Sequence, residues 1–406
     1  MIIEERLKKF ERLGMGMFVH FGAYSVIGKG EWAQHIREIP FDEDMKAVKS
    51  FVIKPDWASE LVAEAKNAGC RYITLTTRHH DGFSLYDTCG LNDYDAPHVS
   101  GRDYVREFVD ACREKDIIPF FYHTLLDWHE ESYNTDFPRY LKYLRSSDEL
   151  LCKNYGEIGV LWFDVMWNKP NEDWEEDALY SLIRSYQPNA MIINNTGLSA
   201  RGALGNIQLD SVTFERGRPA PINKPDAPKY IASEMCQVFA DHWGYAENDI
   251  NFKPMAEIIN DLVTCRRYGS NYLINIGPMA DGSVRLYDRA MLDAIGHWVR
   301  INGEILSAMP TGIEAEGRSD AFVLEKDGTR YLVIEKIKRS SNSNVDLGEA
   351  CSAPVVLKYD KPVSKVTWLD NGEELKFTVN EDGTLSITLT PFKYGKSLIS
   401  RVAKIV

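Results

Sequence analysis

Eight short apolar runs, rich in β-forming residues, recur along the first three quarters of this 406-residue chain. Most are separated by stretches with the 3.6-residue periodicity of amphipathic helices. Those helical stretches are 56–68, 102–115, 138–155, 173–186, 254–268 and 284–302. Strands that alternate with helices eight times are typical of a (β/α)₈ barrel, in which parallel strands form a closed sheet. The predicted strands are 17–21, 71–77, 117–123, 159–164, 191–195, 211–215, 230–235 and 271–276.

The predicted barrel is distorted between its fifth and seventh strands. No helical periodicity separates the fifth strand from the sixth, or the sixth from the seventh. The connecting segments are instead rich in Gly and Asn at 197–206 and rich in Pro at 218–228. Such compositions favour irregular backbone, so we expect long loops at these two places.

The pattern of the chain changes after about residue 307. Short alternating runs follow one another, separated by turn signals of the Asp-Gly and Asn-Gly type, which is typical of an all-β sandwich. The predicted strands are 321–325, 330–336, 354–359, 366–369, 375–380 and 385–390. This region contains no histidine, so we expect a catalytic barrel at 1–307 and a supporting β-sandwich domain at 308–406.

Composition excludes several classes of protein. The net charge of −13 and the pI near 5.3 argue against a nucleic-acid partner, which normally requires a basic face. No window approaches the roughly 18 apolar residues of a membrane span, and no signal peptide is recognisable at the N-terminus. The seven cysteines are odd in number and form no CxxC motif, as expected for reduced thiols. A cytoplasmic location is therefore expected, or a periplasmic or secreted one if a signal was removed.

Polar and aromatic residues gather at the carboxyl ends of six predicted strands. The fourth strand is the most informative, because an apolar run at 159–163 ends abruptly in Asp164. A charge is unfavourable in a core, whereas the carboxyl end of a barrel strand is where catalytic residues lie. An ion-paired or capping role is the structural alternative for Asp164. The other strand ends supply His20, His79 and His80, Tyr122, Glu215 and Glu234, and spacing alone does not rank the two glutamates.

The mixture of side chains at these strand ends suits a sugar. Aromatic faces stack on the apolar face of a pyranose, while carboxylates and imidazoles hold its hydroxyls. Other chemistries lack their sequence signatures, since the chain has no HExxH or HxH metal motif, no GxSxG nucleophile elbow and no Gly-rich phosphate loop. We therefore expect a carbohydrate-active protein without a metal or another cofactor.

In chain order, the same residues resemble the α-L-fucosidases of glycoside hydrolase family 29 over residues 10–305. The motifs are GMFVHFG at 16–22, GEW at 30–32, AGCRY at 68–72, HHDGF at 79–83, LDW at 126–128, LWFD at 161–164, HWGY at 242–245 and GSNYLINIGP at 269–278. The resemblance implies a distorted (β/α)₈ barrel followed by a β-sandwich, and a retaining exo-glycosidase that needs no metal.

The resemblance also implies roles for individual residues. Asp164 matches the nucleophile of the family, and Glu215 is the best match to its acid/base, with Glu234 as the second candidate. Arg201 is the candidate for a family arginine near the nucleophile. The chain departs from common members at 165–167, where a Gly is frequent after the nucleophile, and at 194–206; both segments are expected on the aglycone side. The residues that match fucose-binding positions are His20, Glu31, Trp32, His79, His80, Tyr122 and Trp243.

The implied reaction is hydrolysis of terminal α-L-fucosides on a fucosylated glycan or oligosaccharide, with net retention through a covalent fucosyl-aspartate. It requires Glu215 to stay protonated through a raised pKa while Asp164 stays ionised. Two alternatives are an exo-glycosidase for another L-sugar, such as an α-L-galactoside, and a non-catalytic carbohydrate-binding protein on the same scaffold. Linkage, aglycone and oligomeric state are left open by the sequence.

Overall fold

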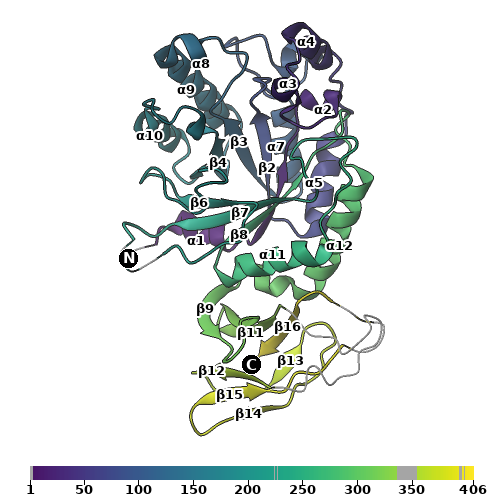
Figure 1. Ribbon diagram of the computed structural model, residues 1–406, viewed down its shortest axis with the longest axis vertical. Helices are drawn as coiled ribbons and strands as arrows, with labels where there is room; N and C mark the ends of the chain where they lie inside the picture. Colours follow the sequence, from purple (N-terminus) through teal and green to yellow (C-terminus); the bar gives the residue numbers. More distant parts are fainter. Residues whose placement is uncertain (1–2, 224, 226, 336–353, 393–395, 397) are drawn as a thin grey trace. The chain divides into compact units, whose positions relative to one another are not determined.

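The computed structural model describes residues 3–223, 225, 227–335, 354–392, 396 and 398–406 of the chain (Figure 1). These residues form two compact units. One consists of Met1–Lys253 and Asn271–Asp293, and the other of Pro254–Ser270 and Ala294–Val406. The last residue of the predicted strand 330–336 and the cysteine at 351 lie outside the described residues.

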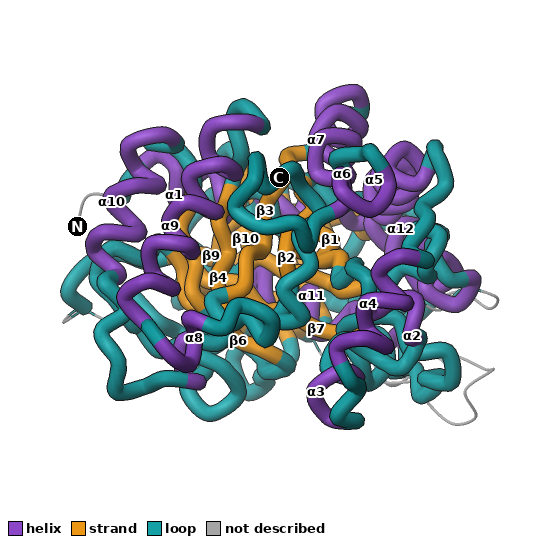
Figure 2. The backbone as a smooth tube through the Cα atoms, turned by 90° about the horizontal axis from the view of Figure 1, so that it is seen from above, coloured by secondary structure: helices purple, strands orange, loops and turns teal. Residues whose placement is uncertain are grey.

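The first unit contains a closed barrel of eight parallel strands that follow one another in chain order, as predicted. Figure 2 shows these strands in orange with helices around them. All eight predicted strands are present, although the first begins two residues earlier than expected and the seventh two residues later. The strands are β1 Met15–Val19, β2 Tyr72–Arg78, β3 Ile118–Thr124, β4 Val160–Asp164, β5 Met191–Asn194, β6 Ser211–Glu215, β7 Ala232–Val238 and β8 Asn271–Ile276.

The six predicted helices are present as α5 Trp57–Ala68, α7 Tyr104–Glu114, α9 Phe137–Asn154, α10 Glu176–Tyr186, α11 Met255–Arg267 and α12 Leu286–Asn302. Among the described residues between β5, β6 and β7 there is no helix, as expected. Short helices were not predicted because few of them repeat an apolar position. They are α1 Glu5–Glu11, α2 Tyr24–Ile27, α3 Ala33–Ile36, α4 Phe41–Lys49, α6 Ala96–Ser100, α8 Ser132–Thr135 and the 3₁₀ turns η1 Met166–Asn168 and η2 Gly303–Ser307.

Large aromatic side chains fill the amino-terminal end of the barrel. A Cβ at Gly16 would lie 2.3 Å from the ring of Tyr72, and one at Gly159 would lie 2.0 Å from that of Phe120. Glycine at these two positions therefore makes room for the rings of the neighbouring strands. Phe10 of α1 lies 6.2 Å from Phe120 between ring centroids and completes the packing at this end. The carboxyl-terminal end is left for a cavity.

The second unit contains a β-sandwich, as predicted. A five-stranded sheet has the order β13-β16-β11-β10-β9 and a three-stranded sheet the order β12-β15-β14, all antiparallel. Buried side chains such as Val323, Leu332, Leu357 and Trp368 form its core. The outer strand β9 and the last strand β16 were not predicted. The strands are β9 Met309–Glu314, β10 Ala321–Lys326, β11 Thr329–Ile334, β12 Val355–Lys358, β13 Val366–Trp368, β14 Phe377–Val379, β15 Thr384–Ile387 and β16 Arg401–Ile405.

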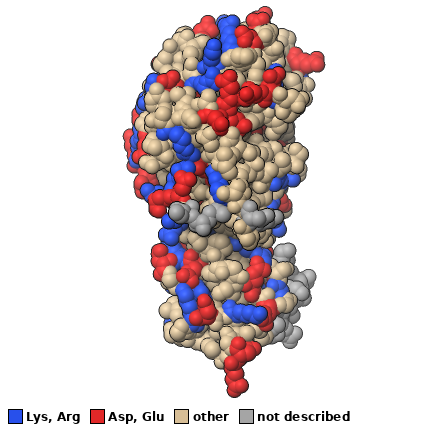
Figure 3. Space-filling view, turned by 90° about the vertical axis from the view of Figure 1, so that its left-hand side faces the viewer, with Lys and Arg blue, Asp and Glu red and all other residues tan. Residues whose placement is uncertain are grey.

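The surface carries both signs of charge. On the face shown in Figure 3, Lys and Arg side chains are interspersed with Asp and Glu, in keeping with an acidic chain that still holds 47 basic residues. None of the described helices is long and apolar enough to span a bilayer.

Candidate active site

A cavity of about 410 Å³ opens at the carboxyl ends of the barrel strands. Two sides of it differ in chemistry. We call His20, His79 and His80, which follow β1 and β2, the histidine wall. We call Asp164, Asn195 and Glu215, which end or follow β4, β5 and β6, the carboxyl wall. The remaining lining residues are Phe18, Trp32, Tyr122, Trp162, Trp167, Gly197, Leu198, Ser199, Cys236 and Trp243.

One amide group joins the two carboxyls of the carboxyl wall. The side-chain nitrogen of Asn195 donates to Asp164 Oδ1 at 3.1 Å and to Glu215 Oε2 at 2.9 Å. Its side-chain oxygen accepts from the Thr213 hydroxyl at 2.7 Å and from the Gly197 N–H at 3.1 Å. These two donors fix the orientation of the amide, so its N–H groups face the carboxyls.

The backbone just after Asp164 turns sharply. Val165 has a φ of 73°, a left-handed conformation that is rare for a β-branched residue and costs free energy. The turn brings the Val165 N–H within 2.9 Å of Asp164 Oδ1, while the Tyr122 hydroxyl donates to Oδ2 at 3.2 Å. Both oxygens of Asp164 are therefore held, and the strain lies at the position where the sequence departs from the family pattern.

The electrostatics of Asp164 differ from the expectation. Its pKa is raised to about 7, mainly by burial and also by the nearby charge of Glu215, while the hydrogen bonds from Asn195, Tyr122 and Val165 work the other way. Burial therefore works against the ionised state that the sequence predicts for Asp164.

The histidine wall is neutral. Burial lowers the pKa of His20 to about 3, although the hydrogen bond to Asn275 works the other way. The Asn275 amide nitrogen donates to the Trp243 carbonyl at 2.7 Å, so its oxygen faces His20 Nδ1 at 2.6 Å. His20 Nδ1 therefore carries the hydrogen, and Nε2 is left as an acceptor.

His80 is fixed in the same way. The Thr124 hydroxyl donates to the Leu126 carbonyl at 3.0 Å, and its oxygen lies 2.7 Å from His80 Nδ1. That nitrogen must donate, so Nε2 again accepts. Burial lowers the pKa of His80 to about 3 and that of His79 well below its ordinary value, with the neighbouring histidines adding to both shifts. The wall offers neutral acceptors for hydroxyl groups.

Comparison with known proteins decides the family. The sequence profile of the α-L-fucosidase family matches residues 4–304. The chain belongs to the α-L-fucosidase family. It is therefore a glycoside hydrolase, built on the barrel and sandwich expected from its sequence.

Individual relatives match between four fifths and all of the chain. The tissue α-L-fucosidase of Mus musculus is 28% identical over 363 residues, covering 80% of this chain and 77% of that protein. The α-L-fucosidase isoenzyme 1 of Paenibacillus thiaminolyticus has a TM-score of 0.83 at 27% identity, covering 99% and 98% of the two chains. A covalent intermediate of a Bacteroides thetaiotaomicron α-L-fucosidase, trapped with 2-fluoro-fucosyl fluoride, shares the fold at 23% identity and a TM-score of 0.81, covering 100% and 96%.

Within this family framework, most sequence-predicted site residues meet in the cavity. Asp164, Glu215, His20, Trp32, His79, His80, Tyr122 and Trp243 all line it. Trp32 lies 5.1 Å from His80 between ring centroids, and Trp243 lies 5.1 Å from His20. Residues from eight separate sequence positions thus form one site, as the convergence of barrel strands requires.

Three predicted residues do not line the cavity. Glu234 is buried inside the barrel, where its carboxyl accepts from the Tyr72 hydroxyl at 2.5 Å and the Trp162 indole at 3.3 Å, and burial raises its pKa to about 7. Glu31 is buried beside the cavity and accepts from the Gly244 N–H at 2.8 Å, which fixes the loop that carries Trp243. Arg201 is exposed, and its guanidinium donates to the Glu215 carbonyl.

Several residues of the site were missed at the sequence level. Asn195 ends the predicted fifth strand just as Asp164 ends the fourth, so the strand-end rule could have identified it. Asn275 lies within the predicted eighth strand, and nothing in its sequence context indicates a role. Arg216, beside Glu215, lies over the Trp243 ring at 5.2 Å, and Trp167 follows the nucleophile candidate.

Among the described residues, no group of three or more His, Cys, Asp or Glu side chains is arranged as metal ligands, and independence from metals stays an expectation.

Proposed function

We propose that this protein hydrolyses terminal α-L-fucosides with net retention of configuration, with Asp164 as nucleophile and Glu215 as acid/base. The observation that carries the proposal is the Asn195 amide, which donates to both carboxyls. The two acceptor oxygens cannot be farther apart than the sum of 3.1 Å and 2.9 Å. Retaining enzymes hold their carboxyls about 5–5.5 Å apart, and inverting enzymes about 6.5–9.5 Å. The geometry supports retention.

The first step uses one ionised and one protonated carboxyl. With Asp164 ionised and Glu215 protonated, the Asp164 carboxylate attacks the anomeric carbon while the bond to the leaving oxygen breaks. The Glu215 proton passes to that oxygen, and an ester joins fucose to Asp164. Asn195 can then donate to the carboxylate that Glu215 has become.

The second step reverses the roles. Glu215 takes a proton from a water molecule, whose oxygen attacks the anomeric carbon and displaces the Asp164 carboxylate. Glu215 ends protonated and Asp164 ionised, which is the starting state. The neutral His20 and His80 would accept hydrogen bonds from fucose hydroxyls at Nε2, and contacts that tighten in the transition state raise the rate.

The nucleophile can be tested by deletion and rescue. Asp164→Ala should lower kcat on an aryl α-L-fucoside by about 10⁴-fold or more, because no covalent intermediate can form. Azide should restore turnover by filling the space and attacking the anomeric carbon, yielding β-L-fucosyl azide. The matched control is Asp110→Ala, which removes an exposed carboxylate on α7 and should leave kcat unchanged.

Three outcomes would contradict the proposal. A folded Asp164→Ala enzyme that azide does not rescue would remove the nucleophile assignment. A first-formed product with β configuration, observed by proton NMR, would indicate inversion. Faster hydrolysis of an aryl α-L-galactoside than of the fucoside would assign the site to a different L-sugar.

A further inference from the structure

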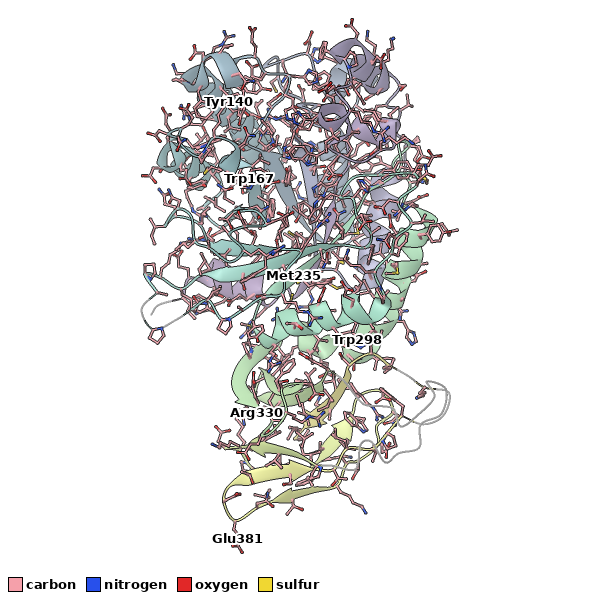
Figure 4. The ribbon with its side chains drawn as sticks, in the orientation of Figure 1. Tyr140, Trp167, Met235, Trp298, Arg330 and Glu381 are labelled. Carbon is pink, nitrogen blue, oxygen red and sulfur yellow. The ribbon has the colours of Figure 1, made fainter. Side chains whose placement is uncertain are left out.

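Two large apolar side chains at the rim of the cavity are exposed to solvent. Trp167 on η1 is 44% exposed and Leu198 in the β5–β6 loop is 54% exposed, and both line the cavity. Single exposed apolar residues are common, but an exposed pair at the mouth of an active site indicates a ligand contact. Figure 4 labels Trp167 in the segment just after β4.

This rim is rigidly built. The η1 turn is anchored at its start by the Val165 N–H on Asp164 and at its end by the Tyr133 hydroxyl, which donates to Asn168 Oδ1 at 2.7 Å. A Cβ on Gly197, whose φ is 76°, would lie 2.7 Å from the Trp167 indole nitrogen, so the edge of the indole rests against this turn. A platform held in place before a ligand arrives loses little entropy when it binds.

Trp167 and Leu198, which we call the platform, lie on the same side of the cavity as the proposed acid/base, Glu215. Leu198 and Ser199 belong to the loop that begins with Asn195, whose amide contacts Glu215 at 2.9 Å. The leaving oxygen must face Glu215 to receive its proton, so the aglycone leaves across this rim. The opposite histidine wall is polar and buried, as a site for the hydroxyls of fucose should be.

We propose that Trp167 and Leu198 bind the aglycone, and that the aglycone is a pyranose ring of the glycan that carries the fucose. The inference rests on the proposed function. The flat indole face suits the apolar face of a sugar ring, and the neighbouring Ser199, which also lines the cavity, offers a hydroxyl to a ring hydroxyl. An aglycone made only of hydrocarbon would give the Ser199 hydroxyl no partner.

The test compares substrates that do and do not reach the platform. α-L-Fucosyl fluoride has no aglycone ring, whereas the α1,2-, α1,3-, α1,4- and α1,6-linked fucosyl-pyranose disaccharides each carry one. Trp167→Ala should lower kcat/KM on the preferred disaccharide by about tenfold, mainly through KM, and leave the fluoride within about twofold. Trp167→Phe should restore part of the loss, because it keeps an aromatic face. Tyr287→Ala, an exposed aromatic on α12 that does not line the cavity, is the matched control.

Each other outcome overturns the inference. Equal losses on fluoride and disaccharide would mean that Trp167 supports the catalytic carboxyls, and no loss on any disaccharide would leave the platform without a ligand. A greater loss on octyl α-L-fucoside than on the disaccharides would assign it to an apolar aglycone. If wild-type enzyme does not hydrolyse the fluoride, the proposed function itself fails, which is a separate result.

Discussion

The histidine wall and the carboxyl wall line the same cavity, yet their pKa values are shifted in opposite directions. On the histidine wall, burial lowers the pKa of His20 and His80 to about 3. On the carboxyl wall, burial raises the pKa of Asp164 to about 7. In both cases desolvation favours the neutral form, because a low-dielectric site penalises any charge.

The consequence of neutrality differs because the two walls need different protonation states. A neutral imidazole with a fixed Nδ1–H is already the required hydrogen-bond acceptor, so the histidine wall works over a wide pH range. The carboxyl pair needs one ionised and one protonated member at the same time. Its working pH range is therefore set by the second carboxyl, by Asn195 and by burial together.

The largest expected effect distinguishes the two glutamates. Glu215→Ala should lower kcat/KM on a fucosyl disaccharide, whose leaving group needs a proton, by about 10³-fold or more. On 2,4-dinitrophenyl α-L-fucoside or the fluoride, whose leaving groups need none, the loss should be at least tenfold smaller. Measuring both substrates on the same enzyme preparation gives the comparison.

Glu234→Gln is the matched variant for this experiment. Glu234 contacts Tyr72 and Trp162 inside the barrel and does not line the cavity. Its loss should lower both substrates by a similar factor, through the position of Trp162. If Glu234→Gln shows the leaving-group dependence and Glu215→Ala does not, the acid/base assignment is reversed.

The next effect concerns Asn195. Asn195→Ala should lower kcat/KM by about 10²-fold, since both carboxyls lose a donor and repel each other. The amide holds the pKa of Asp164 down, so its removal raises that pKa further. Because Asp164 must be ionised to attack, its pKa sets the acidic limb of the kcat/KM profile, which is expected near pH 7 for wild type and should move to higher pH in the variant.

Asn194 provides the control for the pH shift. It is also buried in β5, but its amide donates to the Tyr180 hydroxyl at 3.2 Å, away from the carboxyls. Asn194→Ala should destabilise the protein and leave the acidic limb in place. A limb that moves equally in both variants would mean that general loosening of the barrel causes the shift.

The fold followed closely from the sequence because its signals are local. Each barrel strand is a short apolar run bounded by turn residues, and eight such runs alternating with helices allow few architectures. The same rule that placed Asp164 at a strand end placed His20, Tyr122 and Glu215 there as well. The short helices α2 and α3 were missed, because four residues are too few to show a period.

The electrostatics did not follow from the sequence. The pKa of Asp164 depends on how deeply the cavity is buried and on Asn195 lying between two carboxyls, and neither can be read from spacing. Asn275 shows the same limit, since it acts on His20 from a strand 255 positions away. Contacts between distant strands decide tautomers and pKa values, and a linear pattern carries no record of them.

A charge introduced into the histidine wall should have a smaller effect than the Asn195 change. Asn275→Asp places a carboxylate beside His20 Nδ1, which favours the imidazolium and raises the pKa of His20. An imidazolium has no acceptor left for a fucose hydroxyl, so kcat/KM should fall by about tenfold, the equivalent of one hydrogen bond.

The pH dependence distinguishes charge from misplacement in this variant. The loss in Asn275→Asp should be greatest at low pH and should shrink as His20 loses its proton. Asn275→Ala removes the same hydrogen bond without adding charge, so its loss should be constant with pH. Identical profiles for the two variants would mean that the neutrality of His20 is unimportant.

The smallest expected effect is on stability. The pKa of Asp164 is about 7 in the folded protein and about 3.8 when exposed, so ionisation costs folded-state free energy as the pH rises from 4 to 7. Asp164→Asn removes this cost, and its Tm should exceed that of wild type by a few degrees at pH 8, with the difference shrinking toward pH 4.

For His80, with a folded pKa near 3, stability is instead lost as the pH falls below 6.5. The Tm of His80→Gln relative to wild type should therefore rise toward low pH, opposite in slope to Asp164→Asn. Parallel slopes in thermal melts of the two variants from pH 4 to 8 would mean that burial does not neutralise both walls, and the comparison between them would fail.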